Sequence, residues 1–263
     1  GQCTISSAIC TRDDIMVYLM GKGIDPQVSF QIMEHVRKGK GLQEYTDKQG
    51  NEINEEQVMI DHGVPDWYIW SCEKIEYMFP KAHAAAYVMM AWRIAYCKVY
   101  YPLAYYAAYF SIRADGFSYE LMCQGKEKLE YHIEEYRRRD AELKKENKKM
   151  AAKEQKEFSD MRMVQEMYAR GFDFLPIDLY RAKATKFQII DGKLMPSLIS
   201  IEGMGEQAAA QVESAAKQGP FLSRDDFRTR TKTSTTLIEK MQSLGLFSDL
   251  PESNQLSLFD LVS

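Results

Sequence analysis

The feature that most limits how this chain can fold is one long apolar stretch, AHAAAYVMMAWRIAYCKVYYPLAYYAAYFSI, at residues 82–112. Arg93 and Lys98 interrupt it, and its longest uncharged run, which follows Lys98, is shorter than the roughly 18 residues that a membrane-spanning helix needs. The stretch therefore predicts a pair of buried helices, residues 82–101 and 103–114, rather than a membrane anchor.

Helix-capping residues predict further helices on both sides of this stretch. Thr11 precedes RDDIMVYLM as an N-cap, and Gly23 follows that segment as a stop. Asp25-Pro26 starts the next helix, because proline suits the first helical position. Another helix is predicted at residues 65–78.

Two polar segments are predicted to lie at the surface. Residues 42–58, LQEYTDKQGNEINEEQV, are rich in turn-forming residues and predict a surface loop or a small insertion. Residues 126–157 carry 11 basic and 9 acidic side chains among good helix formers, which predicts a solvated helical face. Neither segment is assigned a function.

The pattern changes after Gly171. The sequence KFQIIDGKLMPSL has two short β-type runs around Asp191-Gly192, which predicts a two-residue β-hairpin. Short helices with glycine breaks follow it. We therefore expect a mainly α fold with a domain boundary near residues 172–180.

Cysteine usage and charge restrict the class of function. The five cysteines are scattered without a C-x-x-C pair, which argues against a zinc site or a disulfide framework and fits a reducing cytoplasm. The N-terminus lacks an initiator Met and the features of a signal peptide, so it is interpreted as a cut inside a longer protein. The net charge is −4, but residues 181–242 carry ten basic and seven acidic side chains. A local basic face is what nucleic-acid binding requires.

A glycine motif lies within this basic segment. In SLISIEGMGEQAAAQVESA, Gly203-Met204-Gly205 precedes a helix in which Ala209 would let two helices approach, the pattern of a helix-hairpin-helix. Glycines permit an unusual turn, so that N–H groups at the next helix N-terminus can face a phosphate without reading base sequence. The alternative is an ordinary tight turn between packed helices. DNA binding is favoured by the cations nearby: Lys217, Arg224, Arg228, Arg230 and Lys232.

A second candidate site lies at the start of the long apolar stretch. Lys81 and His83 follow Pro80 at a predicted helix N-terminus, where cations are unfavourable for the helix dipole. A bound anion would reverse this, since it could contact both side chains and the free N–H groups. By spacing alone, a lone histidine such as His83 is more often structural than functional.

The sequence closes on NQLSLFDLVS, which places Leu256, Leu258 and Phe259 beyond Pro251 and the last predicted helix. Apolar side chains near a chain end gain from burial only when something covers them. This tail either packs on its own domain or binds another protein.

Three segments together carry a resemblance to a known family. FPKAHAAAYVMMAWRIAYCKVYYPLAYYAAYFSIRA, CTRDDIMVYLM and VRKGKGL resemble the fingers region of bacterial replicative DNA polymerase III alpha subunits, and of the PolC type in particular. The glycine hairpin and QLSLF fall where that family has its duplex-binding helix-hairpin-helix region and its sliding-clamp peptide. The resemblance covers nearly the whole chain.

The resemblance implies three regions and three sets of contacts. Residues 1–175, including charged helices at 118–170, would be a helical fingers domain. Residues 176–250 would be a small helix-hairpin-helix domain with a short β-hairpin, and residues 251–263 a flexible tail with the clamp-binding peptide. The implied residues are Arg12, Lys81, His83 and Arg93 for dNTP; Gly203, Met204, Gly205, Glu206, Lys217, Arg228 and Lys232 for duplex DNA; and Gln255, Leu256, Ser257, Leu258 and Phe259 for the clamp.

The resemblance also implies what this chain lacks. The family's catalytic aspartates lie in the palm, upstream of this segment, and Asp13-Asp14 is interpreted as the first turn of a helix. We therefore expect no catalytic residue, metal or cofactor here, no polymerase activity of this chain alone, and Mg²⁺ at the palm of the parent enzyme. Expected partners are primer-template and duplex DNA, dNTP, the sliding clamp (beta subunit), and the rest of the polymerase chain and replisome, in the cytoplasm and without a membrane. The alternative is a non-enzymatic DNA-binding adaptor that recruits the clamp.

Overall fold

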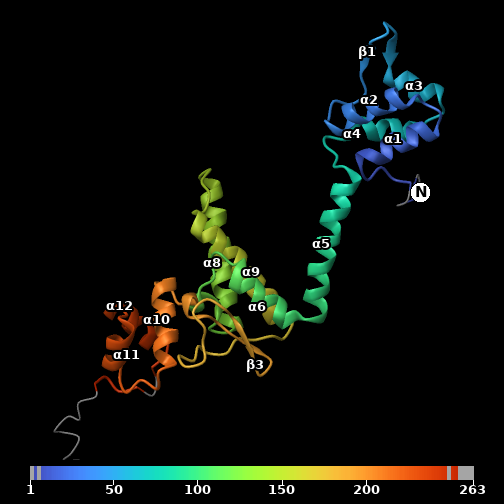
Figure 1. The fold of residues 1–263 in the computed structure, drawn as a ribbon. Coiled ribbons are helices and arrows are strands. Elements are labelled where there is room, and N and C mark those ends of the chain that lie inside the picture. Colours follow the sequence, from blue (N-terminus) through green and yellow to red (C-terminus); the bar gives the residue numbers. More distant parts are fainter. Residues whose placement is uncertain (1–2, 5–6, 248–249, 254–263) are drawn as a thin grey trace, which may run out of the picture. The chain divides into compact units, whose positions relative to one another are not determined.

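The computed structural model describes residues 3–4, 7–247 and 250–253 and shows a mainly helical chain (Figure 1). This described part contains twelve α-helices, one short 3-10 helix and two antiparallel two-stranded sheets, so the predicted fold class is confirmed. The chain divides into two compact units, residues 1–94 and 95–263. The functional boundary expected at residue 175 lies inside the second unit and stays a prediction.

The first unit is a cluster of short helices with one β-hairpin. Its elements are α1 (Arg12–Gly21), α2 (Pro26–Arg37), β1 (Glu44–Thr46), β2 (Glu52–Asn54), α3 (Glu55–Asp61), α4 (Asp66–Lys74) and the first part of α5 (Lys81–Tyr100). The predicted caps are present, because Thr11 and Asp14 form a capping box and Asp25 accepts hydrogen bonds from two N–H groups of α2. The core includes Ile15, Leu19, Ile32, Val36 and Tyr68.

Residues 42–58, predicted to be a surface loop or a small insertion, form β1, β2 and the first half of α3. The two strands are three residues long and have no buried residue, so no apolar alternation marks them in the sequence. Glu55 holds the hairpin to α2: it is fully buried, accepts the Gln43 N–H at 2.8 Å and contacts His35 Nδ1 at 2.8 Å. Burial raises the pKa of Glu55, although the hydrogen bonds from Gln43 and His35 oppose this.

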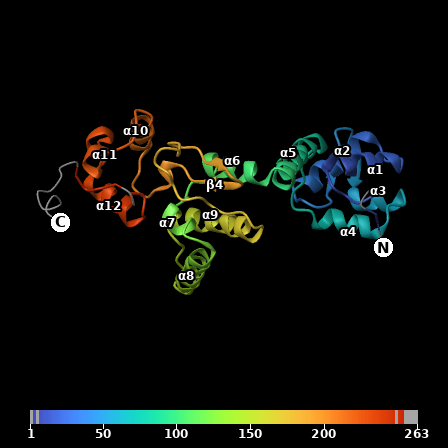
Figure 2. The ribbon, with the colours of Figure 1, turned by 90° about the horizontal axis from the view of Figure 1, so that it is seen from below.

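The second unit has two adjoining apolar cores. Its elements after α5 are α6 (Pro102–Ile112), α7 (Tyr119–Met122), α8 (Lys126–Lys145), α9 (Ala152–Ala169), β3 (Gln188–Ile190), β4 (Lys193–Met195), the 3-10 helix η1 (Leu198–Ser200), α10 (Glu206–Ala216), α11 (Arg224–Thr231) and α12 (Thr235–Ser243). One core lies among helices α6, α7, α8 and α9, and the other lies among η1, α10, α11 and α12. The last three helices lie next to one another in both views (Figures 1 and 2).

The charged segment 126–157 is helical, but it belongs to two helices rather than one. Asn147, at φ +56°, lies in the connection between α8 and α9. Each helix buries one side, with Leu129 and Ile133 on α8 and Met161 and Val164 on α9. Most of the charges lie on the remaining sides, but Glu157 is buried and accepts a hydrogen bond from the Tyr136 hydroxyl at 2.6 Å. The segment is a packed helical pair with a largely solvated outer surface.

The β-hairpin predicted at Asp191-Gly192 is confirmed. Strands β3 and β4 pair antiparallel, with Ile190 opposite Lys193. Asp191 and Gly192 have φ of +50° and +74°, the left-handed conformations that a two-residue turn of this type requires.

The long apolar stretch forms two helices as predicted, but only one of them is buried. Helix α6 buries Tyr106 and Phe110, whereas α5 buries no residue along its length. The prediction of a buried pair is therefore wrong for α5. An apolar composition indicates that a helix is suited to burial, but it does not indicate which other segment packs against it. Within the described ranges, no helix is both long and apolar enough to cross a membrane.

Candidate functional site

The glycine hairpin connects η1 to α10. Gly203 has φ +88°, in the left-handed region that favours glycine, and the Met204 N–H donates to the Ile201 carbonyl at 3.0 Å to close the turn. Gly205 is the N-cap of α10, and no side chain caps this helix. The N–H groups of the first turn of α10 are therefore left for an external acceptor.

Gly205 is a glycine that the fold itself does not require. Its φ and ψ of −77° and 160° suit any residue. A Cβ added at Gly205 would meet no atom within 4 Å. Since neither conformation nor internal packing demands glycine here, the missing side chain leaves room for another molecule to approach the backbone closely.

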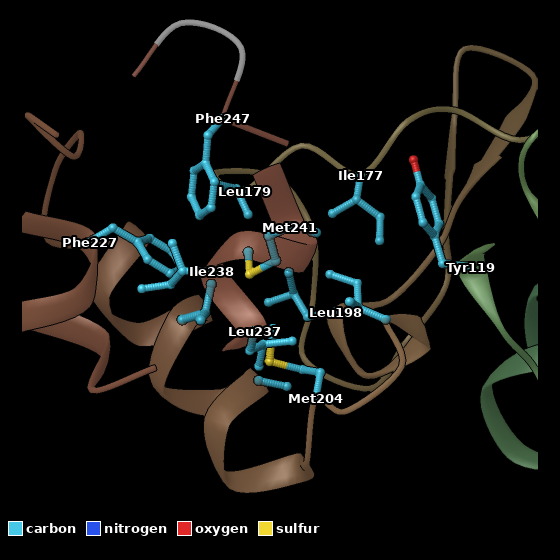
Figure 3. Packing of buried hydrophobic residues seen from close by; sticks show 14 of the residues in the cluster. Tyr119, Ile177, Leu179, Leu198, Met204, Phe227, Leu237, Ile238, Met241 and Phe247 are labelled. Atoms are coloured by element: carbon cyan, nitrogen blue, oxygen red, sulfur yellow. The ribbon is translucent and has the colours of Figure 1, made fainter. Parts of the chain in front are cut away.

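The apolar residues of the hairpin point into the core behind it. Met204 is 4% exposed and belongs to the same cluster as Leu237 and Met241 (Figure 3). Ala209 is fully buried, as the helix-hairpin-helix pattern requires. Met204, one of the predicted DNA-binding residues, thus supports the turn from inside, while Gly203 and Gly205 are exposed.

Two ion pairs and one hydrogen bond connect the exposed edge of the hairpin to three helices. Glu202 contacts Lys240 of α12 at 2.8 Å and Lys153 of α9 at 3.2 Å, and its N–H donates to Glu120 of α7 at 3.2 Å. Hydrogen bonds from Lys240 and Lys153 lower the pKa of Glu202. The two lysines offset the charge of Glu202. Glu206, in the exposed first turn of α10, carries a negative charge close to the same N–H groups.

Two of the five cations near the motif serve the fold. Arg230 donates to the carbonyls of Gly219 and Pro220, each at 3.1 Å, and also to that of Ala215. Arg224 hydrogen-bonds Gln242, so its guanidinium is used within the unit. Their contacts bind α11 to the loop after α10 and to α12.

The other three cations, which are the predicted DNA-binding ones, are exposed. Lys217 pairs with Glu213 at 2.8 Å, one turn before it on α10. Arg228 and Lys232 are exposed and form no ion pair within the described part of the chain. Lys232 lies at φ +55° in the turn between α11 and α12, so this turn also presents a cation to solvent.

The second candidate site lies at the start of α5, in the first unit. The Arg12 N–H donates to the Phe79 carbonyl at 3.2 Å, which brings the start of α1 beside the start of α5. The His83 ring stacks on Phe79 with centroids 5.1 Å apart and lies 4.5 Å from the Tyr87 ring. The structure thus places Lys81 and His83 beside the backbone of Arg12, while the Arg12 guanidinium lies 3.7 Å from the Glu34 carboxylate of α2.

Acids of α1 already contact this helix start. The Lys81 N–H donates to Asp13 Oδ2 at 2.7 Å, and Lys81 Nζ lies 3.1 Å from Asp14 Oδ1. Burial raises the pKa of Asp14, but hydrogen bonds from Thr11 and Lys81 outweigh it, and the net shift is downward. A bound phosphate would therefore have to compete with Asp14 for Lys81.

Arg93, the fourth predicted dNTP residue, lies elsewhere on α5. It is ten residues after His83, which corresponds to about 15 Å along an α-helix. Its guanidinium lies 4.0 Å from the Met90 sulfur. Arg93 therefore does not belong to the cluster at the start of the helix.

The remaining predictions concern the tail and metal binding. The clamp-binding residues Gln255, Leu256, Ser257, Leu258 and Phe259 lie outside the described residues. Asp13 and Asp14 lie in the first turn of α1, as predicted. Over the described residues, no group of three or more His, Cys, Asp or Glu side chains could hold a metal ion.

Sequence reasoning missed the lysines that flank the hairpin from other helices. Lys153 and Lys240 reach Glu202 from 49 and 38 residues away. Nothing in their local sequence marks them. The turn after Lys232 was also missed, although the run TKTST, in which Ser234 caps α12 by accepting the Leu237 N–H, is a readable signal.

Comparisons with known proteins agree with this geometry. A family model described as a helix-hairpin-helix motif matches residues 171–256, which contain the hairpin and α10 to α12. The fold and the glycine turn therefore place this region among helix-hairpin-helix modules.

Sequence relatives extend the assignment to nearly the whole chain. The chain is 48% identical over 259 residues to a protein named DNA polymerase III PolC-type from Caldanaerobacter subterraneus subsp. tengcongensis. Proteins of the same name from Streptococcus suis and Clostridium perfringens are 48% and 46% identical. These matches cover 98–99% of this chain and 17% of each relative. The chain belongs to the PolC-type DNA polymerase III family, as the sequence resemblance indicated, and corresponds to a segment of its members.

Proposed function

We propose that this chain is part of a PolC-type replicative DNA polymerase and that its helix-hairpin-helix region holds duplex DNA by the phosphate backbone. The observation that carries the proposal is Gly205, an exposed glycine at an uncapped helix start that neither the backbone conformation nor internal packing requires. Free N–H groups at such a start are suited to a phosphate oxygen. The exposed side chains of Arg228 and Lys232 add positive charge from the neighbouring helix and turn.

This contact would be independent of base sequence. Main-chain N–H groups and cations bind phosphates, which are the same at every base pair. Each neutralised phosphate releases counterions, so the logarithm of the binding constant should fall with the logarithm of salt concentration by about 0.9 per contact.

We further propose that the start of α5 contributes to binding the incoming dNTP. Lys81 and His83 are exposed there, and the backbone of Arg12 lies beside them. The Arg12 guanidinium would have to leave Glu34 to reach a phosphate. Lys81 would exchange its contact with Asp14 for a phosphate oxygen. The Mg²⁺-dependent chemistry would take place in the rest of the longer protein, and no catalytic step is assigned to this chain.

The tail would bind the sliding clamp. Its sequence, Gln255 to Phe259, concentrates three apolar side chains in five residues after Pro251, which suits a peptide that docks in an apolar pocket. Burial of these side chains offers roughly 1.5–3 kcal/mol each before the cost of ordering the tail is subtracted.

Duplex binding by the 263-residue chain tests the proposed DNA contact. Fluorescence anisotropy with two duplexes of unrelated sequence should give equal affinities and the same negative salt slope. A chain that binds neither duplex at low salt, or that strongly prefers one sequence, would contradict backbone binding.

A second experiment tests the tail. Replacing Leu258 and Phe259 with Ala should leave the melting temperature unchanged and abolish clamp binding in surface plasmon resonance. The matched control replaces Leu261 and Val262, which follow the peptide in the sequence, with Ala. This variant should retain clamp binding. A large loss of thermal stability with intact clamp binding would show that the tail serves the chain's own core.

A further inference from the structure

Helix α5 exposes an apolar surface without parallel in the described part of the chain. None of the residues from Lys81 to Tyr100 is buried. Trp92 is 73% exposed and Met89 is 57% exposed. The same helix exposes Val88, Met90, Ile94 and Val99.

These side chains lie all around the helix rather than on one side. Successive residues are 100° apart at 3.6 residues per turn, so Val88, Met89 and Met90 already point in three directions. Trp92 and Ile94 occupy further directions between them. A helix that is apolar all round is typical of the interior of a large protein.

The charges on α5 indicate what kind of protein surface could pack against it. The chain has no Asp or Glu between Glu76 and Asp115, so α5 carries only cations. Lys98 is paired with Glu166 at 2.7 Å. The guanidinium of Arg93, in the middle of the helix, has no carboxylate partner among the described residues, and its contact there is the Met90 sulfur. An arginine that becomes enclosed needs an anionic partner, because an unpaired buried charge is costly.

We propose that α5 is enclosed by the remainder of the longer polymerase polypeptide, through an apolar surface that carries a carboxylate opposite Arg93. This inference rests on the proposed function, in which the chain is a segment of a longer protein. It is supported by the relatives, of which the chain spans 17%, so that most of their length is available to cover the helix. Nucleic acid is a poorer occupant, since bases stack on aromatic rings but leave Val88, Ile94 and Val99 in water.

A native thiol reports directly on this enclosure. Cys97 lies on α5 and is exposed, and Cys10 is an exposed thiol outside the helix. Maleimide labelling, followed by peptide mass spectrometry, would compare the two cysteines in the 263-residue chain and in the full-length protein. We expect Cys97 to react about as fast as Cys10 in the short chain. In the full-length protein its rate relative to Cys10 should fall at least about tenfold, which corresponds to about 1.4 kcal/mol of protection.

If α5 is not enclosed by the rest of the polypeptide, the labelling rate of Cys97 will differ from this expectation, and each of the following results would overturn the proposal. Equal relative rates in the two proteins would show that α5 stays open. Slow labelling of Cys97 in the short chain would show that the chain's own units cover it. Protection that grows with the concentration of the short chain would indicate a second copy, and protection on adding primer-template DNA would indicate nucleic acid.

Matched substitutions test the surface and its predicted carboxylate. Trp92→Glu on α5 and Trp70→Glu on α4 place the same charge at positions 73% and 63% exposed. Both should leave the melting temperature of the short chain unchanged, whereas in the full-length protein Trp92→Glu should lower it and Trp70→Glu should not. Arg93→Gln should also lower it there, and Arg93→Lys should restore most of the loss. Equal effects of the two tryptophan variants, or no effect of Arg93→Gln, would overturn the assignment.

The failure of this inference can be told apart from the failure of the proposed function. Primer extension by the unmodified full-length protein measures the polymerase activity independently of α5. A full-length protein that extends primers while Cys97 remains open contradicts the enclosure alone.

Discussion

The glycine hairpin and helix α5 are the two surfaces through which this chain is proposed to act, and they are built in opposite ways. At the hairpin, Met204 and Ala209 are buried, and what reaches solvent is backbone and charge. On α5 the apolar side chains themselves are in solvent. The hairpin is thus complete as a surface before any partner binds, whereas α5 has the composition of an interior helix. The difference teaches that a preformed surface can bind a polar ligand, whereas an exposed apolar helix indicates a protein contact that is always present.

The largest expected effect separates the two surfaces by stability. Phe227 is fully buried in the same cluster as Met204 (Figure 3). Its ring centroid lies 4.9 Å from that of Phe221 and 5.0 Å from that of Phe247. Phe227→Ala should destabilise the 263-residue chain by about 3–5 kcal/mol through lost burial and a cavity. Trp92→Ala on α5 should change stability by less than about 0.5 kcal/mol. Urea unfolding measures both, and a large loss for Trp92→Ala would mean that α5 is covered within this chain.

The next effect concerns the start of α5 and is measured in the full-length enzyme. Lys81→Ala should raise the KM for dNTP about tenfold, because a hydrogen bond to a charged group contributes about 1.5–3 kcal/mol. Duplex affinity should stay unchanged. Lys22→Ala is the matched control, since Lys22 lies at the opposite end of α1, where its Nζ donates to the Gly63 carbonyl. Unchanged steady-state constants for Lys81→Ala would remove Lys81 from the nucleotide site.

A smaller effect concerns the frame that holds α10. A hydrogen bond from Lys217, and then one from the Ala184 N–H, lower the pKa of Glu213 to about 2 from an ordinary value of 4.5. A carboxylate with a depressed pKa contributes stability above its unfolded pKa and loses it as pH falls through the folded value. Glu213→Gln should therefore cost about 1 kcal/mol at pH 7, after allowance for solvent screening, and nothing near pH 2.

Thermal melts of the two proteins from pH 7 down to pH 2 check this prediction. The difference between them should shrink between pH 4.5 and 2. A difference that stays constant over that range would show that the side chain acts through packing rather than through its charge.

The smallest effect concerns a single phosphate contact. Arg228→Ala should weaken duplex binding equally for all sequences and reduce the salt slope by about 1. Arg137, an exposed arginine on α8, provides the control, and Arg137→Ala should leave the slope unchanged. The same slope for wild type and Arg228→Ala would place Arg228 outside the DNA contact.

The sequence predicted the parts of the molecule that depend on local chemistry. Caps at Thr11 and Asp25 and the Asp191-Gly192 turn are properties of a few neighbouring residues, and they are present. The hairpin glycines were also readable, because Gly203 requires a positive φ that few other residues adopt.

What the sequence did not predict depends on contacts between distant segments. The strands β1 and β2 are too short and too polar to show a period, and Glu55 holds them by contacts with residues 12 and 20 positions away. The exposure of α5 was also missed, since burial of an apolar helix depends on what lies beside it. Arg224 and Arg230 resembled DNA-binding cations until their partners within the fold were visible.

The central claim is that the open backbone at Gly205 contacts duplex DNA, and a pair of glycine substitutions tests it most directly. Gly21 shares the two features that matter, because its φ is not positive and a Cβ added there meets no atom within 4 Å, but it lies at the end of α1. We predict that Gly205→Val weakens duplex binding at least about tenfold, or about 1.4 kcal/mol, without lowering the melting temperature by more than Gly21→Val does, and that Gly21→Val binds DNA as the wild type does. Equal duplex affinities for Gly205→Val and Gly21→Val would contradict the account.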